Sequence, residues 1–502
     1  MPKIIIREYD KTKASSTAYN NFAVLVPGFC ASGSNASVFD ENGVYECDSQ
    51  AEFIKNIGKA AATDIAVISA AKAPELDSNT VVSADNFESL RASGILYYAR
   101  KKEAGNTDIG YLEDASHKYE LVSSLDEFKE NFEDAVDEYS GYAVIEIGKE
   151  GADEVRVAQM GNQIAYELLG LGYTVLFKNI NTASVAALAD ESFWEPLHDK
   201  AVYDFRYVIT GLSPTNQSAD AVNGVNNAII DLANAVNTAK DPMDTGRGDC
   251  TALVDICLSA YSQVSQATAI TNIQNQVKEL HASKYAAAFA PYVTYNMVED
   301  EVYKNTTFPA SFHYLACAAK AAENYNEWYA IAGYDRGVSN YSIDSTGCKF
   351  GDIAINKLCP RNNANGVSKA VNIIAKIKNN YYLWGNRTLN TLGEELIASD
   401  FLNIRQLCTS IKKQVYVACR KFTFDPNSDV LWINFQNAIK PLLEKMKADQ
   451  GISDYKFIKC KTDKKAVLMA KLRIVPIEAV EDFEIDLTLE NSITGTSIGI
   501  AE

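Results

Sequence analysis

The sequence predicts a multidomain protein of mixed α/β and α+β class, and three observations support this prediction. Residues from about 126 to 305 alternate between short apolar runs and longer amphipathic runs, which is the pattern of an open α/β domain. From about residue 306 onward, helices are expected first and strands after them, which is an α+β order. The chain has 502 residues, more than one hydrophobic core ordinarily serves.

The α/β segment consists of apolar runs separated by polar turns. Strands are predicted at residues 143–147, 174–178, 207–210, 252–256 and 286–293, and helices at residues 155–169, 219–240 and 273–280. Upstream of this segment, a buried strand is predicted at residues 22–26 and a helix at residues 49–62. The middle of the chain should therefore form a sheet covered by helices.

The clearest periodicity lies in residues 404–422, where apolar side chains recur at helical spacing. This spacing places Arg405, Lys412, Lys413 and Arg420 on the other faces of one amphipathic helix with a basic exterior. Two strands are then expected, at residues 455–460 and 467–475.

Each end of the chain carries an apolar run that is typical of a lone strand. The side chains that define these two runs are Ile4, Ile5 and Ile6 at one end, and Phe483, Ile485, Leu487 and Leu489 at the other. The second set alternates with polar residues, so that strand has one apolar face. A lone strand on a polar tether can pair with the sheet of another subunit, and pairing within its own chain is the alternative.

Charge is unevenly distributed along the chain. The formal net charge is −18, which argues against nucleic acid or an anionic membrane as the main partner. Residues 1–150 carry net −12 and residues 401–475 carry net +9. The two regions are electrostatically complementary, which suits self-association or a separate acidic partner, although unrelated solvated surfaces would give the same counts.

The cysteines and the hydropathy indicate where the protein is made. The ten cysteines contain no C-x-x-C pair, so we interpret them as free, buried small hydrophobes of a protein made in a reducing cytoplasm. No stretch approaches the roughly 18 to 20 apolar residues that cross a bilayer, and residues 1–10 hold no apolar signal core. We therefore expect no membrane insertion.

Motifs that would support catalysis lack their structural context. Gly148 and Lys149 have no glycine five residues upstream and so form no phosphate-binding loop. Residues 495–499 match G-x-S-x-G without a following helix, and residues 247–249 form a short polar loop before a strand. The four histidines lack metal-ligand spacing. The sequence predicts no catalytic, cofactor-binding or metal-binding residue, and an α/β enzyme is the rival class.

Several local motifs occur in an order that resembles the contractile tail sheath family of phages and related contractile injection particles. They lie in residues 22–28, 45–58, 247–255, 283–293, 308–311, 328–337, 383–389, 402–405, 422–427 and 431–432. The most specific is the W-G-x-R-T-L motif within residues 383–389. The chain departs from the family pattern at Pro27, Tyr292 and Asn386, which is typical of a divergent member.

This resemblance implies a non-enzymatic sheath subunit in five segments. They are an N-terminal strand arm (1–20), a mixed α/β domain (21–125), an outward-facing α/β domain (126–305), a tube-facing sheath domain (306–480) and a C-terminal strand arm (481–502). Such subunits would form stacked hexameric rings around a tail tube, linked by strand exchange. With no phosphate-binding loop found, contraction would draw on energy stored in the lattice.

The resemblance also implies partners and a location. We expect the chain to contact copies of itself, a tail tube protein, and baseplate and tail-terminator proteins, within a virion tail assembled in the host cytoplasm. A bacteriocin-like or secretion-type apparatus is the alternative particle. If the C-terminal domain faces inward, the candidates for contact with an acidic tube are Lys369 and Lys376 on one helix face, Lys378 near the end of that helix, and Lys412 and Lys413.

Overall fold

The computed structural model describes residues 22–28, 38–57, 96–100, 120–121, 142–146, 149–180, 188–212, 218–234, 247–296, 306–360, 362–363, 367–461 and 468–479. Between residues 96 and 159, it describes the backbone elements alone. The predicted arms, with Ile4, Ile5, Ile6, Phe483, Ile485, Leu487 and Leu489, lie outside the described residues.

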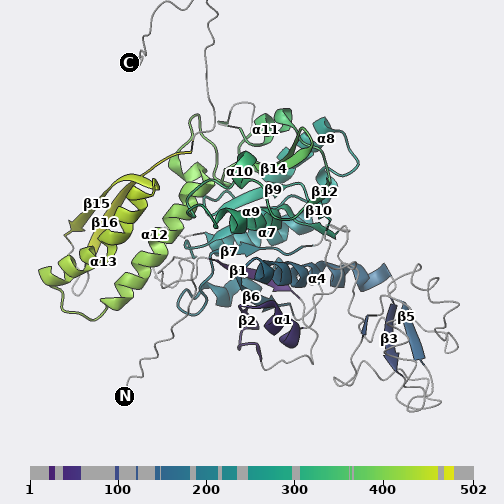
Figure 1. Ribbon diagram of the computed structural model, residues 1–502, viewed down its shortest axis with the longest axis horizontal. Coiled ribbons are helices and arrows are strands. Elements are labelled where there is room, and N and C mark those ends of the chain that lie inside the picture. Colours follow the sequence, from purple (N-terminus) through teal and green to yellow (C-terminus); the bar gives the residue numbers. More distant parts are fainter. Residues whose placement is uncertain are drawn as a thin grey trace, which may run out of the picture.

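An eight-stranded mixed sheet forms the centre of the fold (Figure 1). Its strands, in spatial order, are β14 (Asn380–Trp384), β13 (Val371–Ile377), β9 (Ala286–Ala290), β8 (Thr251–Asp255), β7 (Tyr207–Ile209), β1 (Ala23–Gly28), β6 (Thr174–Asn179) and β2 (Val44–Cys47). The six inner strands are parallel, and the edge strands β14 and β2 are antiparallel to their neighbours. The predicted α/β sheet is therefore confirmed for the strands at residues 174–178, 207–210, 252–256 and 286–293, whereas the strand predicted at residues 143–147 belongs to a separate sheet.

Helices cover both faces of this sheet. On one face lie α7 (Ala219–Ala233), α8 (Gln266–Lys278) and α11 (Asp352–Leu358), and on the other lie α1 (Gln50–Asn56), α4 (Lys149–Gly170) and α9 (Ala310–Ala321). In β1, Leu25 packs into the first core and Val24 into the second, because successive side chains of a strand point to opposite faces. Full burial of such a side chain contributes about 1.5–3 kcal/mol.

Helix α4 lies unusually close to the central strand. A Cβ atom at Gly161 would lie 1.8 Å from the carbonyl oxygen of Pro27, so only glycine lets the α4 backbone approach β1 this closely.

Smaller elements surround this centre. A second sheet has the order β11 (Thr306–Phe308), β10 (Val293–Tyr295), β12 (Ile343–Thr346), and a third has the order β4 (Glu120–Leu121), β3 (Leu96–Arg100), β5 (Tyr142–Glu146). The short helices are α6 (Glu191–Trp194), α10 (Gly333–Arg336) and the 3₁₀ turns at Glu195–His198, Leu258–Ala260 and Ala398–Asp400.

The C-terminal unit, residues 402–476, consists of α12 (Leu402–Lys421), α13 (Asp429–Ala448), β15 (Ile452–Cys460) and β16 (Met469–Pro476). It extends to one side of the central sheet, in yellow-green in Figure 1. Its own small core includes Leu407, Phe435, Leu443 and Trp328. The helix and the two strands predicted here are confirmed, with ends shifted by a few residues.

One expectation about the order of elements is wrong. Residues 306–384 do not place helices before strands, because β11, β12, β13 and β14 alternate with α9, α10 and α11. The apolar run of β13 is buried between both cores and pairs in parallel with β9, so it belongs to the central sheet. The domain boundaries expected near residues 125 and 305 therefore separate strands that pair within one sheet. This sheet includes β1 and β2, which precede residue 125.

Candidate assembly surfaces

The hairpin of β15 and β16 is a candidate site for strand addition. The two strands pair with each other and, within the described residues, with no other strand, so their outer edges are unpaired there. Tyr455, Phe457, Leu472 and Ile474 form the face that packs on the core of the C-terminal unit. An unpaired edge next to a packed apolar face can accept a further strand from another chain.

The opposite face of this hairpin is basic. Lys456 lies directly across from Arg473 in the register, and Lys471 lies across from Ile458. Lys456, Lys471 and Arg473 are exposed. Like charges directly opposite each other destabilise a pair of strands, so acidic side chains placed over this face would stabilise it.

A buried network joins α12 to the amino ends of the central strands. Arg206 is 1% exposed, and its guanidinium lies 2.7 Å from the Glu327 carboxylate. The same group donates to the side-chain oxygens of Gln406 and Ser410 at 2.9 Å. Gln406 also donates to the hydroxyl of Thr251 at 3.1 Å. These bonds hold α12 against the ends of β7 and β8.

Two motifs that lie apart in the sequence meet at the start of α12. The side-chain amide of Asn386 donates to Asn403 at 2.7 Å, and the backbone N–H of Asn403 donates to the side-chain oxygen of Asn386 at 3.0 Å. Asn403 also donates to the carbonyl of Trp328 at 3.1 Å. The family departure at Asn386 is therefore part of a hydrogen-bonded junction, which the sequence pattern did not reveal.

The two lysines of α12 named as tube candidates have different surroundings. Lys413 is 5% exposed, forms an ion pair with Asp204, and donates to the carbonyl of Phe205 at 3.0 Å. Lys412 is exposed, and its ammonium donates to the carbonyl of Gly248 at 2.8 Å and the hydroxyl of Tyr285 at 2.9 Å. The expected basic exterior of α12 is wrong at Lys413, since its charge is used within the chain.

The expected helix carrying Lys369, Lys376 and Lys378 is wrong. Lys369 precedes β13, is 9% exposed, and donates to the carbonyls of Lys278 and Leu280 at the end of α8. Burial lowers the pKa of Lys369. Lys376 lies in β13 with its ammonium 5.3 Å from the Tyr381 ring centroid, and Lys378 is exposed in the turn before β14. The structure brings Lys376 and Lys378 to one hairpin and leaves Lys369 inside the fold.

Arg247 in the R-G-D tripeptide is also structural. It is 1% exposed, donates to the carbonyls of Leu197 and Tyr203 at 2.7 and 2.8 Å, and pairs with Asp249 at 3.1 Å. Its guanidinium lies 3.9 Å from the Phe205 ring centroid. Residues 247–250 form neither helix nor strand before β8, as predicted, and Arg247 is buried within this loop.

Two buried titratable groups on the described residues hold α9 in place. Asp255 accepts hydrogen bonds from the backbone N–H and the hydroxyl of Ser311 at 2.8 and 2.5 Å, and burial raises its pKa to about 7. His313 lies 2.7 Å from the hydroxyl of Tyr295, and burial lowers its pKa to about 3. Both groups are enclosed by the fold, so we interpret them as parts of the α9 junction.

The described cysteines are free thiols. Cys47, Cys250, Cys257 and Cys317 are buried, as predicted, whereas Cys348, Cys359, Cys408 and Cys460 are only partly buried and Cys419 is exposed. Within the described ranges, no cluster of three or more His, Cys, Asp or Glu side chains is arranged to hold a metal ion. Among the described helices, none combines the length and the apolar character that a membrane span needs.

No family model matches the sequence, and no curated protein matches it. Among solved structures, the chain is similar to a protein of the six-fold symmetrised baseplate of the anti-feeding prophage, at 13% identity and a TM-score of 0.53, covering 98% of this chain and 99% of that chain. It is also similar to a protein of the sheath complex of an extracellular contractile injection system, PVC, in its contracted state, at 12% identity and a TM-score of 0.50, covering 98% of both chains. The resemblance carried by the sequence motifs is confirmed at the level of the fold, and the chain has the fold of proteins that build contractile injection systems.

Proposed function

We propose that the chain is a structural subunit of a contractile sheath. It polymerises as stacked hexameric rings around a tail tube, and contraction drives the tube through the target envelope. The observation that carries this proposal is the likeness of the fold to proteins of two contractile particles over 98% of the chain. Fold alone does not determine function, so the ordered motifs of the sequence are the second support.

The subunits are linked by exchange of terminal strands. The hairpin of β15 and β16 supplies edges that are unpaired within the described residues, and residues 3–8 and 483–490 are the predicted arms. Main-chain hydrogen bonds to an added strand survive rotation of one subunit against the next, because the tethers absorb the motion. Rings joined in this way can slide without separating.

Charge and hydropathy both match the C-terminal arm to this hairpin. Residues 477–502 contain acidic residues and no lysine or arginine. In a strand over residues 483–490, the apolar side chains would continue the face packed on α13, and Glu484 and Asp486 would lie on the face of Lys456 and Arg473. The acidic side chains would then relieve the like-charge contact across the hairpin.

The tube is contacted by exposed lysines of the sheath domain. Lys378, exposed in the turn of the β13–β14 hairpin, and Lys376, partly exposed on β13, are the candidates that extend beyond the buried core. Exposed charge pairs are worth about 0.2–1 kcal/mol each, so the contact is weak in one subunit and strong along the tail. Baseplate and tail-terminator proteins would close the two ends of this polymer.

Electron microscopy of the purified protein tests this function. We expect negatively stained preparations to contain rings or striated tubes of sixfold symmetry. Sedimentation that shows a monomer at every protein and salt concentration would overturn the proposal. Nucleic acid inside the purified particle would identify a virion, whereas a particle without it would identify a bacteriocin-like or secretion-type apparatus.

A further inference from the structure

Three cations surround the ring of Tyr285, which precedes β9 and is 5% exposed. The Arg405 guanidinium lies 4.8 Å from the ring centroid, the Lys412 ammonium 4.6 Å and the Lys284 ammonium 5.5 Å. We call these three cations and the ring the Tyr285 cluster. Within the described residues, none of the three cations forms an ion pair, although Asp204, Asp249 and Glu327 pair with other cations near α12.

Arg405 is the unusual member of this cluster. It is 8% exposed, yet its side chain donates no hydrogen bond to any described residue, and its Nε–H is fully buried without a partner. A guanidinium carries five N–H donors, and leaving a buried cation unpaired is costly. The cation–π contact with the Tyr285 ring provides no oxygen acceptor for any of these N–H groups.

Three other cations near α12 form ion pairs, unlike the cations of the Tyr285 cluster. Arg206 pairs with Glu327, Arg247 with Asp249, and Lys413 with Asp204. The nearby carboxylates are therefore engaged with other cations. In the Tyr285 cluster, the Lys412 ammonium donates to two neutral acceptors, the Gly248 carbonyl and the Tyr285 hydroxyl.

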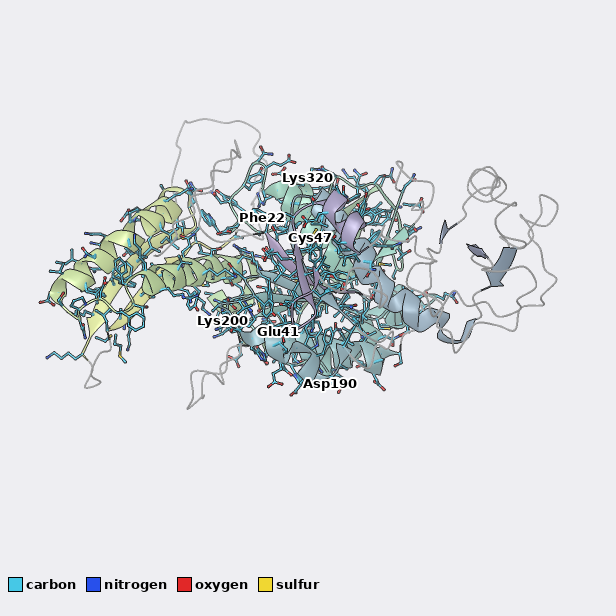
Figure 2. The ribbon with its side chains drawn as sticks, turned by 90° about the horizontal axis from the view of Figure 1, so that it is seen from below. Phe22, Glu41, Cys47, Asp190, Lys200 and Lys320 are labelled. Carbon is cyan, nitrogen blue, oxygen red and sulfur yellow. The ribbon has the colours of Figure 1, made fainter. Side chains whose placement is uncertain are left out.

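The cluster is open to an approaching chain. Lys412 is exposed and Lys284 is half-buried, and both ammonium groups lie within 5.5 Å of the centroid of the ring that Arg405 also contacts. Lys200 is half-buried nearby, and its pKa is lowered mainly by burial, with the Lys412 charge a minor cause. Figure 2 shows Lys200 on the side of the central sheet from which α12 projects.

We propose that the Tyr285 cluster binds a carboxylate side chain of a second copy of this chain. Arg405 would bind the carboxylate with its free N–H groups, and Lys412 and Lys284 would flank it. The chain has net charge −18, and residues 1–150 carry net −12, so a second copy presents abundant carboxylates. This inference rests on the proposed function, in which copies of the chain lie side by side.

Replacing Arg405 separates a docking role from a structural one. Arg405→Met keeps the apolar stem over Tyr285 and removes the unpaired charge. We expect the melting temperature of the unassembled subunit to be unchanged or higher, and assembly to need about tenfold more protein. Lys357→Met on α11, which removes an exposed charge elsewhere, should change neither value. A lower melting temperature, or normal assembly, for Arg405→Met would overturn the inference.

Isotope-mixed cross-linking identifies the partner directly. Full-length protein labelled with ¹⁴N and with ¹⁵N is mixed before assembly, coupled with a carbodiimide and analysed by mass spectrometry. We expect Lys412 or Lys284 to be joined to an Asp or Glu of the other isotope. Polymers in which both lysines couple only within one chain, or not at all, would overturn the inference while the sheath function stands. Absence of any polymer would instead count against the function.

Discussion

The guanidinium of Arg206 lies 2.7 Å from the Glu327 carboxylate, in a network where the arginine side chain is 1% exposed. The same guanidinium donates to Gln406 and Ser410, so one buried cation connects the residue before β7 to two turns of α12. Force applied to the C-terminal unit would reach the central sheet through this contact.

Arg206→Met should lower the free energy of unfolding by about 3 kcal/mol, because removing one partner leaves the Glu327 carboxylate unpaired. Denaturant unfolding of the unassembled subunit measures the change. Lys357→Met, at an exposed position, should remain within about 0.5 kcal/mol of the wild type. A loss no greater than that of the control would contradict the assigned role.

Asp255 should make the folded state less stable as pH rises. Burial raises its pKa to about 7 in the folded state, above the ordinary value of 3.8, so the folded protein binds an additional proton between about pH 4 and pH 7. The free energy of unfolding therefore falls across that window, by roughly 4 kcal/mol at most. Asp255→Asn should remove this slope, as measured by denaturant unfolding at a series of pH values.

His313 contributes the opposite slope, so the comparison must be between wild type and variant. Its pKa is lowered to about 3 by burial, below the ordinary value of 6.5, and the stability it contributes is lost as pH falls below about 6.5. The wild type and Asp255→Asn share the His313 contribution. The difference between their free energies of unfolding at each pH therefore reports on Asp255 alone. Parallel pH profiles for the two proteins would refute the assignment.

Ile485→Asp combined with Leu487→Asp should abolish polymerisation and leave the subunit folded. Charged side chains on the apolar face of the C-terminal arm cannot be buried against a neighbouring subunit without partners. Sedimentation velocity and electron microscopy measure the loss. Thr488→Asp, on the polar face, is the matched control and should polymerise normally. Normal tubes from the double variant would remove this strand from the lattice.

Charge reversal tests which sheet the C-terminal arm joins. Lys456→Glu combined with Arg473→Glu should prevent polymerisation, because the exposed hairpin face would then repel Glu484 and Asp486 of the arm. Adding Glu484→Lys and Asp486→Lys to the same chain should restore tubes. Failure of the compensating changes, with a folded subunit, would place the arm elsewhere.

Lys376→Glu combined with Lys378→Glu should yield sheaths that polymerise without enclosing a tube. The exposed β13–β14 hairpin would repel an acidic tube surface, and a weak contact repeated in every subunit would be lost throughout the tail. The fraction of sheaths that contain a tube, counted by electron microscopy, measures the effect. Lys357→Glu controls for added negative charge, and an unchanged fraction would exclude this hairpin.

Local sequence patterns predicted several strands of the central sheet, but not which strands pair with one another. The strands at residues 174–178, 207–210 and 252–256 appear as β6, β7 and β8, because their apolar runs are bounded by polar turns. Nothing in the sequence indicated that β1 lies between β6 and β7, since pairing of distant strands is a tertiary property. The helix expected to carry Lys369, Lys376 and Lys378 is wrong, because a seven-residue spacing of two lysines does not by itself distinguish a helix from a strand.

The cations of α12 show a second limit of sequence patterns. Helical spacing placed Arg405 and Lys413 away from the main apolar stripe, yet they are 8% and 5% exposed. Arg405 packs on Tyr285 and Lys413 binds Asp204, and both partners come from loops far upstream. Periodicity describes one helix, whereas burial of a polar face depends on what the rest of the chain places against it.

The position of β1 has a consequence for synthesis of the chain on the ribosome. This early strand pairs in parallel with β6 and β7, which end at residues 179 and 209. Both of its edges therefore remain without their native partners until most of the first 209 residues have emerged. Meanwhile the nascent chain exposes an apolar strand that can pair with other molecules, so truncated products ending before β6 should aggregate and depend on chaperones.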